Sequence, residues 1–352
     1  MSLARYRGDG LKKVATDVLE RAGVARRHAE TVADSLIHAD LRGVASHGIS
    51  RLPVYLKRME AGLVDCRREP VLAKQNGAVA LLDGGNQLGA IVGEAALEHA
   101  LELARRYGTG LVGVCHSNHF GACSYYALQA VEQKMMLLVL SNAPKAMAPT
   151  GGVRPFFGTN PISIGIPADK EPPFLLDMAT SVSARGKVVL AQKRGEKIPG
   201  DWALNAQGEP TTDPDEALRG TLLPIGGAKG YGLAMFVDIL CGLLTGGVAG
   251  PEVGSLEDSG PAAQDVGHFF WAVDIGKFMP LEQFLQRMDA YIRRIKAEPR
   301  RPGAEQIWIP GEIEWHKMRE NEAKGIPLDP AIIAEVEEAC RRYGVDLKQA
   351  LC

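Results

Sequence analysis

The chain has 352 residues, which is enough for about two domains with a sizeable core. Its 40 Lys and Arg residues nearly balance its 42 Asp and Glu residues, and the absence of a dense basic block argues against nucleic acid or an anionic membrane as partner. Charges occur throughout the first 30 residues and no apolar run reaches membrane-spanning length, so neither a secretory signal nor a transmembrane helix is expected. We therefore expect a cytoplasmic protein that binds a small molecule.

The six cysteines are scattered and show no Cys-x-x-Cys spacing of the kind that zinc sites and redox motifs use. We therefore expect all of them to be reduced thiols. They are Cys66, Cys115, Cys123, Cys241, Cys340 and Cys352.

The first part of the chain is expected to be mainly helical. Apolar residues recur at spacings of three and four over 11–21 and 28–41, which predicts two helices, and a third helix is expected to begin after Ser46. Short apolar runs at 71–73 and 79–83 then predict two strands.

From residue 93 onward, helices and strands alternate, which is typical of α/β proteins with a parallel or mixed sheet. The segment 195–223 is rich in Gly, Pro and polar residues and is expected to run over the surface. The expected helices are 93–107, 122–133 and 181–194, and the expected strands are 111–115, 136–140, 162–166 and 174–177.

An almost wholly apolar helix is expected over 231–244, where only Asp238 interrupts the apolar run. Such a helix should be buried in the core or in a subunit contact. After it we expect a strand over 268–275, an amphipathic helix over 281–295, and two helices with one highly charged face over 313–324 and 330–343.

These patterns divide the chain into three regions. Residues 1–85 form a mainly helical region that carries a candidate catalytic helix, and residues 86–280 form a central α/β domain that is expected to bind a nucleotide. Because residues 1–85 and 281–352 both lack the central alternation, the C-terminal helical region is expected to pack back on the N-terminal one.

The segment Ser46-His47-Gly48-Ile49-Ser50-Arg51 is a candidate for acid/base chemistry. Ser46 is a favoured N-cap residue, and a helix that begins there places His47, Arg51 and Tyr55 four residues apart on one face. Histidine titrates near neutral pH, and an arginine can hold a carboxylate through two hydrogen bonds. An ordinary capped helix with a solvated polar face explains the same spacing.

A second candidate segment, 115–121, follows a predicted buried strand and precedes a predicted helix, where α/β proteins usually bind ligands. Its two histidines, His116 and His119, lie three residues apart, but no carboxylate or third histidine is near them in the sequence. We therefore expect no metal site. One histidine is expected to orient substrate, and the other may be structural.

Two glycine-rich segments are candidates for cofactor binding. The loop 141–161 contains Ser141, Asn142, Thr159 and Asn160, and its backbone N–H groups could approach a phosphate or a nicotinamide carboxamide, although a plain linker of turns is an equal alternative.

The segment 226–232 opens the apolar helix, so Lys229 and the helix N-terminus could bind an anion. Gly230 stands where a P-loop has Ser or Thr, and no strand is followed by G-x-G-x-x-G, so neither a P-loop nor a standard Rossmann domain is expected.

Taken together, the clusters resemble the malate/L-lactate dehydrogenase family that is distinct from the Rossmann-type enzymes sharing those names. The resemblance lies in six ordered matches between residues 39 and 235 and in a weaker match near 309–327. The matching segments are ADLRGVASHGISR, HSNHFGA, SNAP with GGVRPFFGTNP, LLDMATSVSARGKV, IPGDWALNAQGEPTTDP and GGAKGYGLAM, followed by IPGE and KGIP.

The resemblance implies a non-Rossmann mixed-sheet α/β fold like that of sulfolactate dehydrogenase, a homodimer, and bound NAD or NADP. It implies that His47 is the general acid/base, with Ser46 beside it and Arg51 on the substrate carboxylate, while His119 remains a rival for the acid/base role. It carries cofactor contacts over to Ser141, Asp177, Met178, Ala179, Lys229, Gly230, Gly311 and Glu312.

We therefore predict hydride transfer between a nicotinamide and C2 of a small 2-hydroxy or 2-oxo acid of the malate or lactate type. The family also includes reductases of cyclic imino acids, and the sequence offers no residue that decides between the two. A nucleotide-binding protein without catalysis and a metal-dependent lyase or hydrolase are more distant alternatives.

Two further features are left open by the sequence. The weakly patterned segment 248–264 is expected to form a loop that shapes the substrate pocket. Lys187, Lys193 and Arg194 could meet the 2′-phosphate of NADP, but a solvated basic helix end explains them as well.

Overall fold

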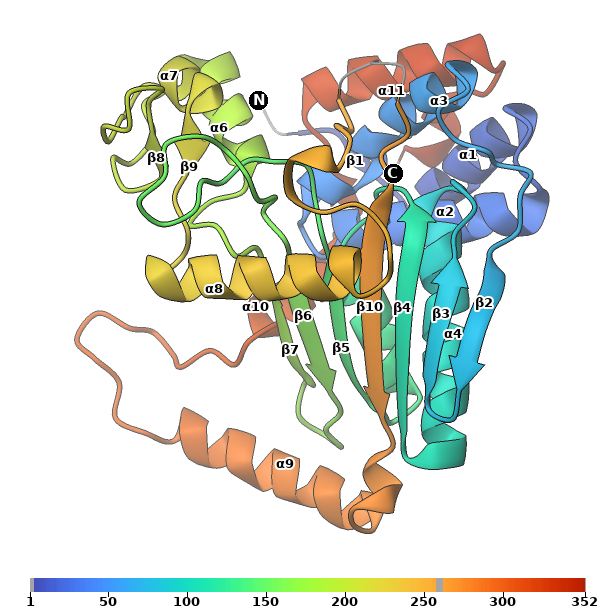
Figure 1. The fold of residues 1–352 in the computed structure, drawn as a ribbon, viewed down its shortest axis with the longest axis vertical. Coiled ribbons are helices and arrows are strands. Elements are labelled where there is room, and N and C mark those ends of the chain that lie inside the picture. The colour runs from blue at the N-terminus through green and yellow to red at the C-terminus, as the bar shows by residue number, and fades with distance from the viewer. Residues whose placement is uncertain (1–2, 258–261, 352) are drawn as a thin grey trace.

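A seven-stranded sheet with helices on both faces forms the centre of the molecule (Figure 1). The structure is a computed structural model that describes residues 3–257 and 262–351, so that Cys352 and part of the segment 248–264 lie outside it, as does the side chain of Lys193. The strand order is β2-β3-β4-β10-β5-β6-β7. Within the described part of this sheet, β3 and β4 run parallel, and the other neighbouring strands run antiparallel to each other. The predicted mixed-sheet α/β class is confirmed.

The sheet strands lie close to the predicted runs, but they are generally a few residues longer or shorter. They are β2 (Val71–Asn76), β3 (Val79–Asp83), β4 (Thr109–Ser117), β5 (Met136–Ser141), β6 (Ile162–Ile166), β7 (Phe174–Met178) and β10 (Val266–Val273).

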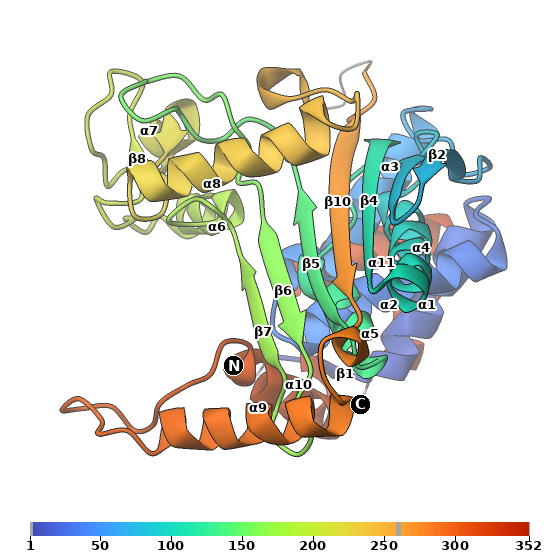
Figure 2. The ribbon, with the colours of Figure 1, turned by 60° about the horizontal axis from the view of Figure 1, so that its bottom comes forward.

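The central strand β10 contributes to the hydrophobic core on both faces of the sheet. It pairs with β4 on one side and β5 on the other, and seven residues of its run VGHFFWAV are apolar or glycine because both faces are covered. On one face lie α4 (Gly89–Tyr107) and α5 (Cys123–Glu132), and on the other lies α8 (Ala228–Asp238), as Figures 1 and 2 show.

Helices from the two ends of the chain share one hydrophobic core. It contains residues of α1 (Gly8–Arg21), α2 (Arg26–Leu41), α3 (Leu52–Glu60) and α11 (Pro330–Arg342). The short strands β1 (Arg5–Tyr6) and β11 (Ile326–Pro327) pair beside it, and α10 (Glu312–Lys324) contacts α2. The end regions are therefore in direct contact.

The segment 195–223 is more ordered than the sequence indicates. It contains α7 (Pro214–Arg219) and the paired strands β8 (Ala203–Leu204) and β9 (Thr221–Leu222). These elements form a small core with α6 (Arg185–Arg194). Most of the segment is exposed or half-buried, which agrees with a path over the surface, while its few buried apolar residues pack against the helix that precedes it.

Helix α8 differs from its prediction in two ways. It ends at Asp238 and continues as a π-helical turn, Ile239–Leu243, and it exposes several large apolar side chains. Its Ala234 and Val237 are buried against the sheet and the adjacent loop, so α8 is only partly buried in the core of this chain. Its exposed apolar residues, with those of the π-helical turn and the residue after it, are Leu233, Met235, Phe236, Ile239, Leu243 and Leu244.

Helix α9 (Leu281–Lys296) lies at the bottom of Figure 1, across the ends of the strands β5, β6 and β7.

Within the described part of the chain, no helix is both long enough and apolar enough to cross a bilayer. The five cysteines that the structure describes are free thiols, in agreement with the prediction.

Candidate active site

The segment that carries His47 is folded as two 3-10 turns, Ala45–His47 and Ile49–Arg51, and the α-helix begins only at Leu52. The predicted single helix from Ser46 is therefore wrong, and Ser46 makes no N-cap hydrogen bond. The physical reason is the buried carboxyl group of Asp40. Its Oδ2 accepts a hydrogen bond of 2.6 Å from the Ile49 backbone N–H.

Gly48 lies directly against this carboxyl group. A Cβ atom at position 48 would lie 1.8 Å from Asp40 Oδ1, so the turn needs glycine for its close approach. Burial raises the pKa of Asp40 to about 7, although the Ile49 N–H group opposes this shift. The turn that carries His47 is therefore fixed by a tertiary contact with α2.

All five residues that the sequence analysis proposed for catalysis gather at one place. The rings of His47 and His119 are stacked with centroids 5.5 Å apart and an interplanar angle of 26°. The Tyr55 hydroxyl lies 2.7 Å from His119 Nδ1, and the Ser46 hydroxyl lies 2.9 Å from His47 Nδ1. Arg51 completes the group by donating from Nε to the Ser46 carbonyl oxygen at 2.6 Å. The structure thus brings together two imidazoles, a phenol and a guanidinium.

Both imidazoles are neutral at neutral pH. Burial, followed by the nearby charge of Arg51, lowers the pKa of His47 to about 4. Burial also lowers the pKa of His119 well below its usual value, and His47, Arg51 and His268 add to this shift. Burial raises the pKa of Tyr55, so its phenol keeps its proton. Either imidazole can therefore accept a proton from a substrate hydroxyl group.

The segment 248–264 contacts this group at several points. Glu257 Oε1 accepts a hydrogen bond of 2.6 Å from Arg51 Nη1. Gln264 Oε1 accepts one of 3.0 Å from the backbone N–H of His119. The expectation that this segment lies beside the candidate substrate site agrees with these contacts.

His268 is a site residue that the sequence analysis missed. It is fully buried in β10, with Nδ1 3.0 Å from Ser141 Oγ and Nε2 2.9 Å from Ser117 Oγ. Its ring stacks on Phe120 with centroids 4.0 Å apart, and burial lowers its pKa to about 3. The sequence feature that could have indicated His268 is a single polar residue in an otherwise apolar strand.

The side chains of Asn142 and Asn160 bind the protein's own backbone. Asn142 bridges the Val248 carbonyl oxygen, at 3.0 Å, and the Gly267 N–H, at 2.8 Å. Asn160 donates to the Ala234 carbonyl oxygen at 2.9 Å and accepts from the Ala143 N–H at 3.1 Å. These amides hold the loop 141–161 against α8 and β10.

The other proposed cofactor residues lie along β7 and its neighbours. Asp177 and Met178 end β7, Ala179 follows them, and the Thr159 carbonyl oxygen accepts from the Thr180 N–H at 2.8 Å. The Thr180 carbonyl oxygen in turn accepts from the Ile225 N–H at 2.9 Å.

Ile225 lies just before the first turn of α8, where Lys229 is exposed. Gly230 is buried in the same turn, and a Cβ there would lie 2.2 Å from the Ile225 carbonyl oxygen. The structure therefore places Lys229 and Gly230 next to the segment that follows β7.

On the other side of β7, Gly311 has a φ of 86° and packs so closely that a Cβ would lie 2.6 Å from Leu175 Cβ. Glu312 caps this turn by accepting from the Ile309 N–H at 3.0 Å and forms an ion pair with Lys296. Asp177 Oδ2 accepts from the Ser124 N–H at 3.0 Å. Candidate cofactor residues therefore flank β7 on both sides.

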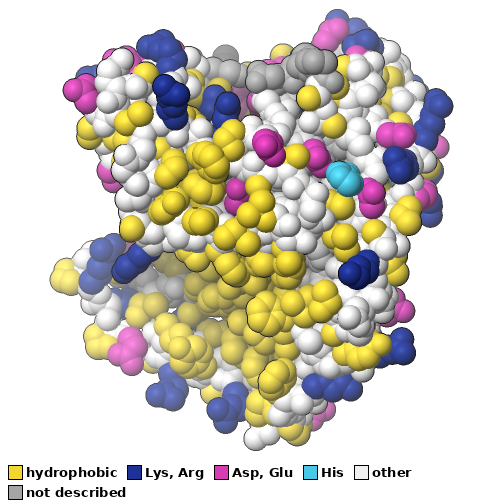
Figure 3. Space-filling view, in the orientation of Figure 1, with side chains coloured by type: hydrophobic (Ala, Val, Ile, Leu, Met, Phe, Trp, Pro, Cys, Tyr) yellow, Lys and Arg dark blue, Asp and Glu magenta, His cyan; other side chains and the backbone are white. Residues whose placement is uncertain are grey.

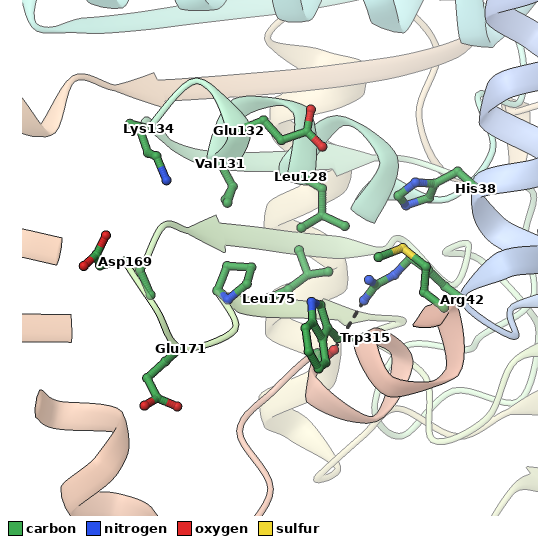
Figure 4. Close-up of a pocket in the computed structure, with 14 residues that line it drawn as sticks. His38, Arg42, Leu128, Val131, Glu132, Lys134, Asp169, Glu171, Leu175 and Trp315 are labelled. Carbon is green, nitrogen blue, oxygen red and sulfur yellow. Dashed lines mark hydrogen bonds between the residues drawn. The ribbon is translucent and has the colours of Figure 1, made fainter. Parts of the chain in front are cut away.

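A cavity of about 320 Å³ opens beside Gly311 (Figure 4). Two buried nitrogen atoms of its lining, Arg42 Nε and His38 Nε2, have no hydrogen-bond partner among the described residues. Arg42 Nη2 makes one long bond, 3.5 Å, to the Gly311 carbonyl oxygen. An unpartnered guanidinium N–H and an unpartnered imidazole nitrogen fit a polar ligand group.

These features define a mixed-sheet α/β protein of a non-Rossmann type, with a half-buried acid/base cluster at one end of the sheet. The family model for malate/L-lactate dehydrogenase matches residues 7–337. The chain therefore belongs to this family and is an oxidoreductase of its dehydrogenase class.

Individual relatives agree. The chain is 41% identical to the malate dehydrogenase of Pyrococcus abyssi over 345 residues, which cover 96% of this chain and 94% of that protein. The solved sulfolactate dehydrogenase of Methanocaldococcus jannaschii matches with a TM-score of 0.92 and 36% identity, covering 98% and 99% of the two chains. The Δ1-piperideine-2-carboxylate reductase of Pseudomonas syringae matches with a TM-score of 0.85 and 28% identity, covering 95% and 99%.

Proposed function

We propose that this protein transfers a hydride between NAD or NADP and C2 of a small 2-hydroxy or 2-oxo acid of the malate, lactate or sulfolactate type. The observation that carries the proposal is the pair of neutral imidazoles, His47 and His119, stacked beside the guanidinium of Arg51. The cofactor supplies the hydride chemistry, and the protein supplies position and proton transfer.

In the oxidation direction, one imidazole takes the proton of the substrate hydroxyl group while Arg51 binds the carboxylate. His47 is our first choice because Ser46 fixes its Nδ1 and leaves Nε2 for the substrate. His119 is the rival, since Tyr55 orients it in the same way. Arg51 Nη1 is engaged by Glu257, so a substrate carboxylate competes with that side chain for the guanidinium fork.

The cofactor is proposed to lie along β7, with contacts from Ser141, Asp177–Ala179, Lys229–Gly230 and Gly311–Glu312. In this arrangement the cavity beside Gly311 takes the adenosine end. The unpartnered nitrogen atoms of Arg42 and His38 support a polar group there. They also offer a place for the 2′-phosphate of NADP, in addition to the basic end of α6.

We also propose that the protein is a homodimer in which the apolar face of α8 lies in the interface. Figure 3 shows hydrophobic side chains gathered across the face on which α8 lies. Phe236 and Leu243 are 48% and 67% exposed, and patches of such side chains on a single chain mark interaction surfaces. Light scattering coupled to gel filtration tests this, because Leu243→Glu should shift a dimer towards the monomer.

We also propose a cytoplasmic location, because the described cysteines are free thiols and the cytoplasm keeps thiols reduced.

The decisive experiment is a panel of 2-oxo acids, including oxaloacetate, pyruvate and sulfopyruvate, crossed with NADH and NADPH. Δ1-Piperideine-2-carboxylate belongs in the same panel, because the structural match to its reductase favours the imino acid reaction as the second candidate. A rate with the imine that exceeds every 2-oxo acid would replace our proposal with that candidate.

The two histidines are separated by single variants. His47→Ala should lower kcat by about 100-fold or more and change the Kd of the cofactor little, because general acid/base catalysis typically contributes such a factor. Cofactor affinity is measured independently by nucleotide fluorescence. If His47→Ala turns over normally and His119→Ala does not, His119 is the base.

A further inference from the structure

A mixed group of potential metal ligands lies at the ends of two neighbouring strands. Asp83 ends β3, while Cys115 and His116 are near the end of β4. Because the two strands are parallel and Asp83 pairs with Cys115 in the register, their ends meet at one edge of the sheet. One ligand atom from each of the three residues lies within 4.8 Å of the other two. The sequence analysis missed this carboxylate because 33 residues separate Asp83 from His116.

The backbone at His116 makes this grouping possible. Consecutive side chains in a strand point to opposite faces, so Cys115 and His116 would ordinarily diverge. His116 instead has a φ of 54°, a left-handed conformation that is uncommon for residues other than glycine. The conformation is held by hydrogen bonds to the carbonyl oxygens of Cys115, from the Gly84 N–H at 2.8 Å, and of His116, from the Asn86 N–H at 2.7 Å. As a result, His116 Nδ1 lies 3.2 Å from Asp83 Oδ1.

A second carboxyl group stands nearby, at the residue before β10. Asp265 also has a φ of 54°, and its Oδ1 is buried without a hydrogen-bond partner among the described residues. Such an orphaned acceptor is costly unless a ligand satisfies it.

The thiol of Cys115 responds to both carboxylates. Burial raises its pKa to about 11, and the negative charges of Asp83 and Asp265 add to the shift. His116 and Arg68 act in the opposite direction on Asp83, since both lower the pKa of its carboxyl group. A divalent cation would supply the charge that stabilises the thiolate.

We propose that Asp83, Cys115 and His116 bind one divalent transition metal ion, with Zn²⁺ as the best match, and that the negative charge of Asp265, which lies outside this group of three, adds to the attraction for the cation. Thiolate, imidazole and carboxylate are the ligands of tetrahedral zinc, at about 2.0 to 2.3 Å from the metal. The side chains of His116 and Asp83 are 48% and 35% exposed, which leaves them room to rotate towards a metal ion. Binding releases the thiol proton of Cys115 to solvent, so affinity increases with pH.

The proposed ion lies behind the catalytic cluster and takes no part in its chemistry. It connects the ends of β3 and β4, and His119 follows His116 by three residues, in the loop directly after β4. Gln264, next to Asp265, accepts the backbone N–H of His119. The ion therefore stabilises the loops that position His119, and the inference stands independently of the proposed reaction.

The test uses the full chain, freed of metal with a chelator and then titrated with Co²⁺ and Zn²⁺. We expect one Co²⁺ per chain with a near-ultraviolet thiolate-to-cobalt absorption band, displacement of Co²⁺ by Zn²⁺, and a higher Tm with Zn²⁺. The band should disappear in Cys115→Ala. His116→Asn should weaken Zn²⁺ binding by about tenfold or more. Asn tolerates the left-handed backbone, so this variant keeps the test valid if Cys115→Ala fails to fold.

Two controls distinguish the site from adventitious binding. Cys66→Ala removes a thiol that is half-buried and distant from the site in the sequence, and His119→Ala disrupts the close pair of imidazoles in the candidate active site. Both should keep the cobalt band and the Zn²⁺ affinity. The proposal is overturned if no band forms, if the band survives in Cys115→Ala, or if either control abolishes it.

Discussion

The carboxyl group of Asp40 makes the stability of this protein depend on pH in an unusual direction. It is buried beneath the turn that carries His47, and its pKa is raised from 3.8 to about 7. Between these values the folded chain holds a proton that the unfolded chain has released. The stability contributed by the protonated group is therefore fully present below about pH 4 and is lost as the pH rises to about 7.

The size of the loss follows from the shift. A difference of about 3 pKa units, at about 1.4 kcal/mol each, corresponds to roughly 4 kcal/mol of unfolding free energy. Asp40→Asn removes the titration but keeps an oxygen that can accept the Ile49 N–H. The variant should be within about 1 kcal/mol of wild type at pH 4.5 and more stable by several kcal/mol at pH 8.

Urea unfolding of wild type and Asp40→Asn at a series of pH values from 4.5 to 8 measures this difference. The exposed Asp201 supplies a matched control, because Asp201→Asn should leave the slope of wild type unchanged. If Asp40→Asn follows the wild-type slope throughout, the carboxyl group is ionised in the folded protein and the reasoning is wrong.

Three further changes test the site around this turn. Gly48→Ala should destabilise the fold by about 2 kcal/mol or more, measured by urea unfolding, because its Cβ would meet the Asp40 carboxyl group at 1.8 Å; wild-type stability would refute the packing. Arg51→Lys should raise the KM of the acid substrate about tenfold or more with a smaller effect on kcat, because the planar fork is lost. Glu257→Gln should lower that KM, but by less than about fivefold, because the Glu257 side chain in its ion pair with Arg51 is 66% exposed; an increase would show that Glu257 helps to bind substrate.

Regular elements were predictable where one pattern extends over many residues. The helices over 11–21 and 28–41 lie inside α1 and α2, because a stripe of apolar residues at helical spacing must face a core. The buried strands β4 and β5 were equally clear. Local periodicity could not reveal that β10 pairs between them, since strand order is set by contacts distant in the sequence.

The candidate site was predictable in membership but not in geometry. His47, Arg51 and Tyr55 do gather, yet not on the face of one helix, because the contact between Asp40 and Gly48 divides the segment into two turns. His119 joins them from the loop after β4, 64 residues after Tyr55, through a hydrogen bond that no local pattern encodes. His268 was missed for the same reason, since its role depends on two serines from different strands.

The same dependence on distant contacts makes the acid/base cluster easy to perturb without touching it. His47 rests on a turn fixed by α2, and His119 rests on a loop fixed by Gln264 and by Tyr55. Neither imidazole lies in an α-helix or a β-strand, so a few hydrogen bonds determine the position of each ring. Variants at Asp40 or Gln264 should therefore lower kcat through misplacement of an intact imidazole, and their pH–rate profiles should keep the shape of the wild type. Loss of the base itself would change that shape, which separates a positioning role from a catalytic one.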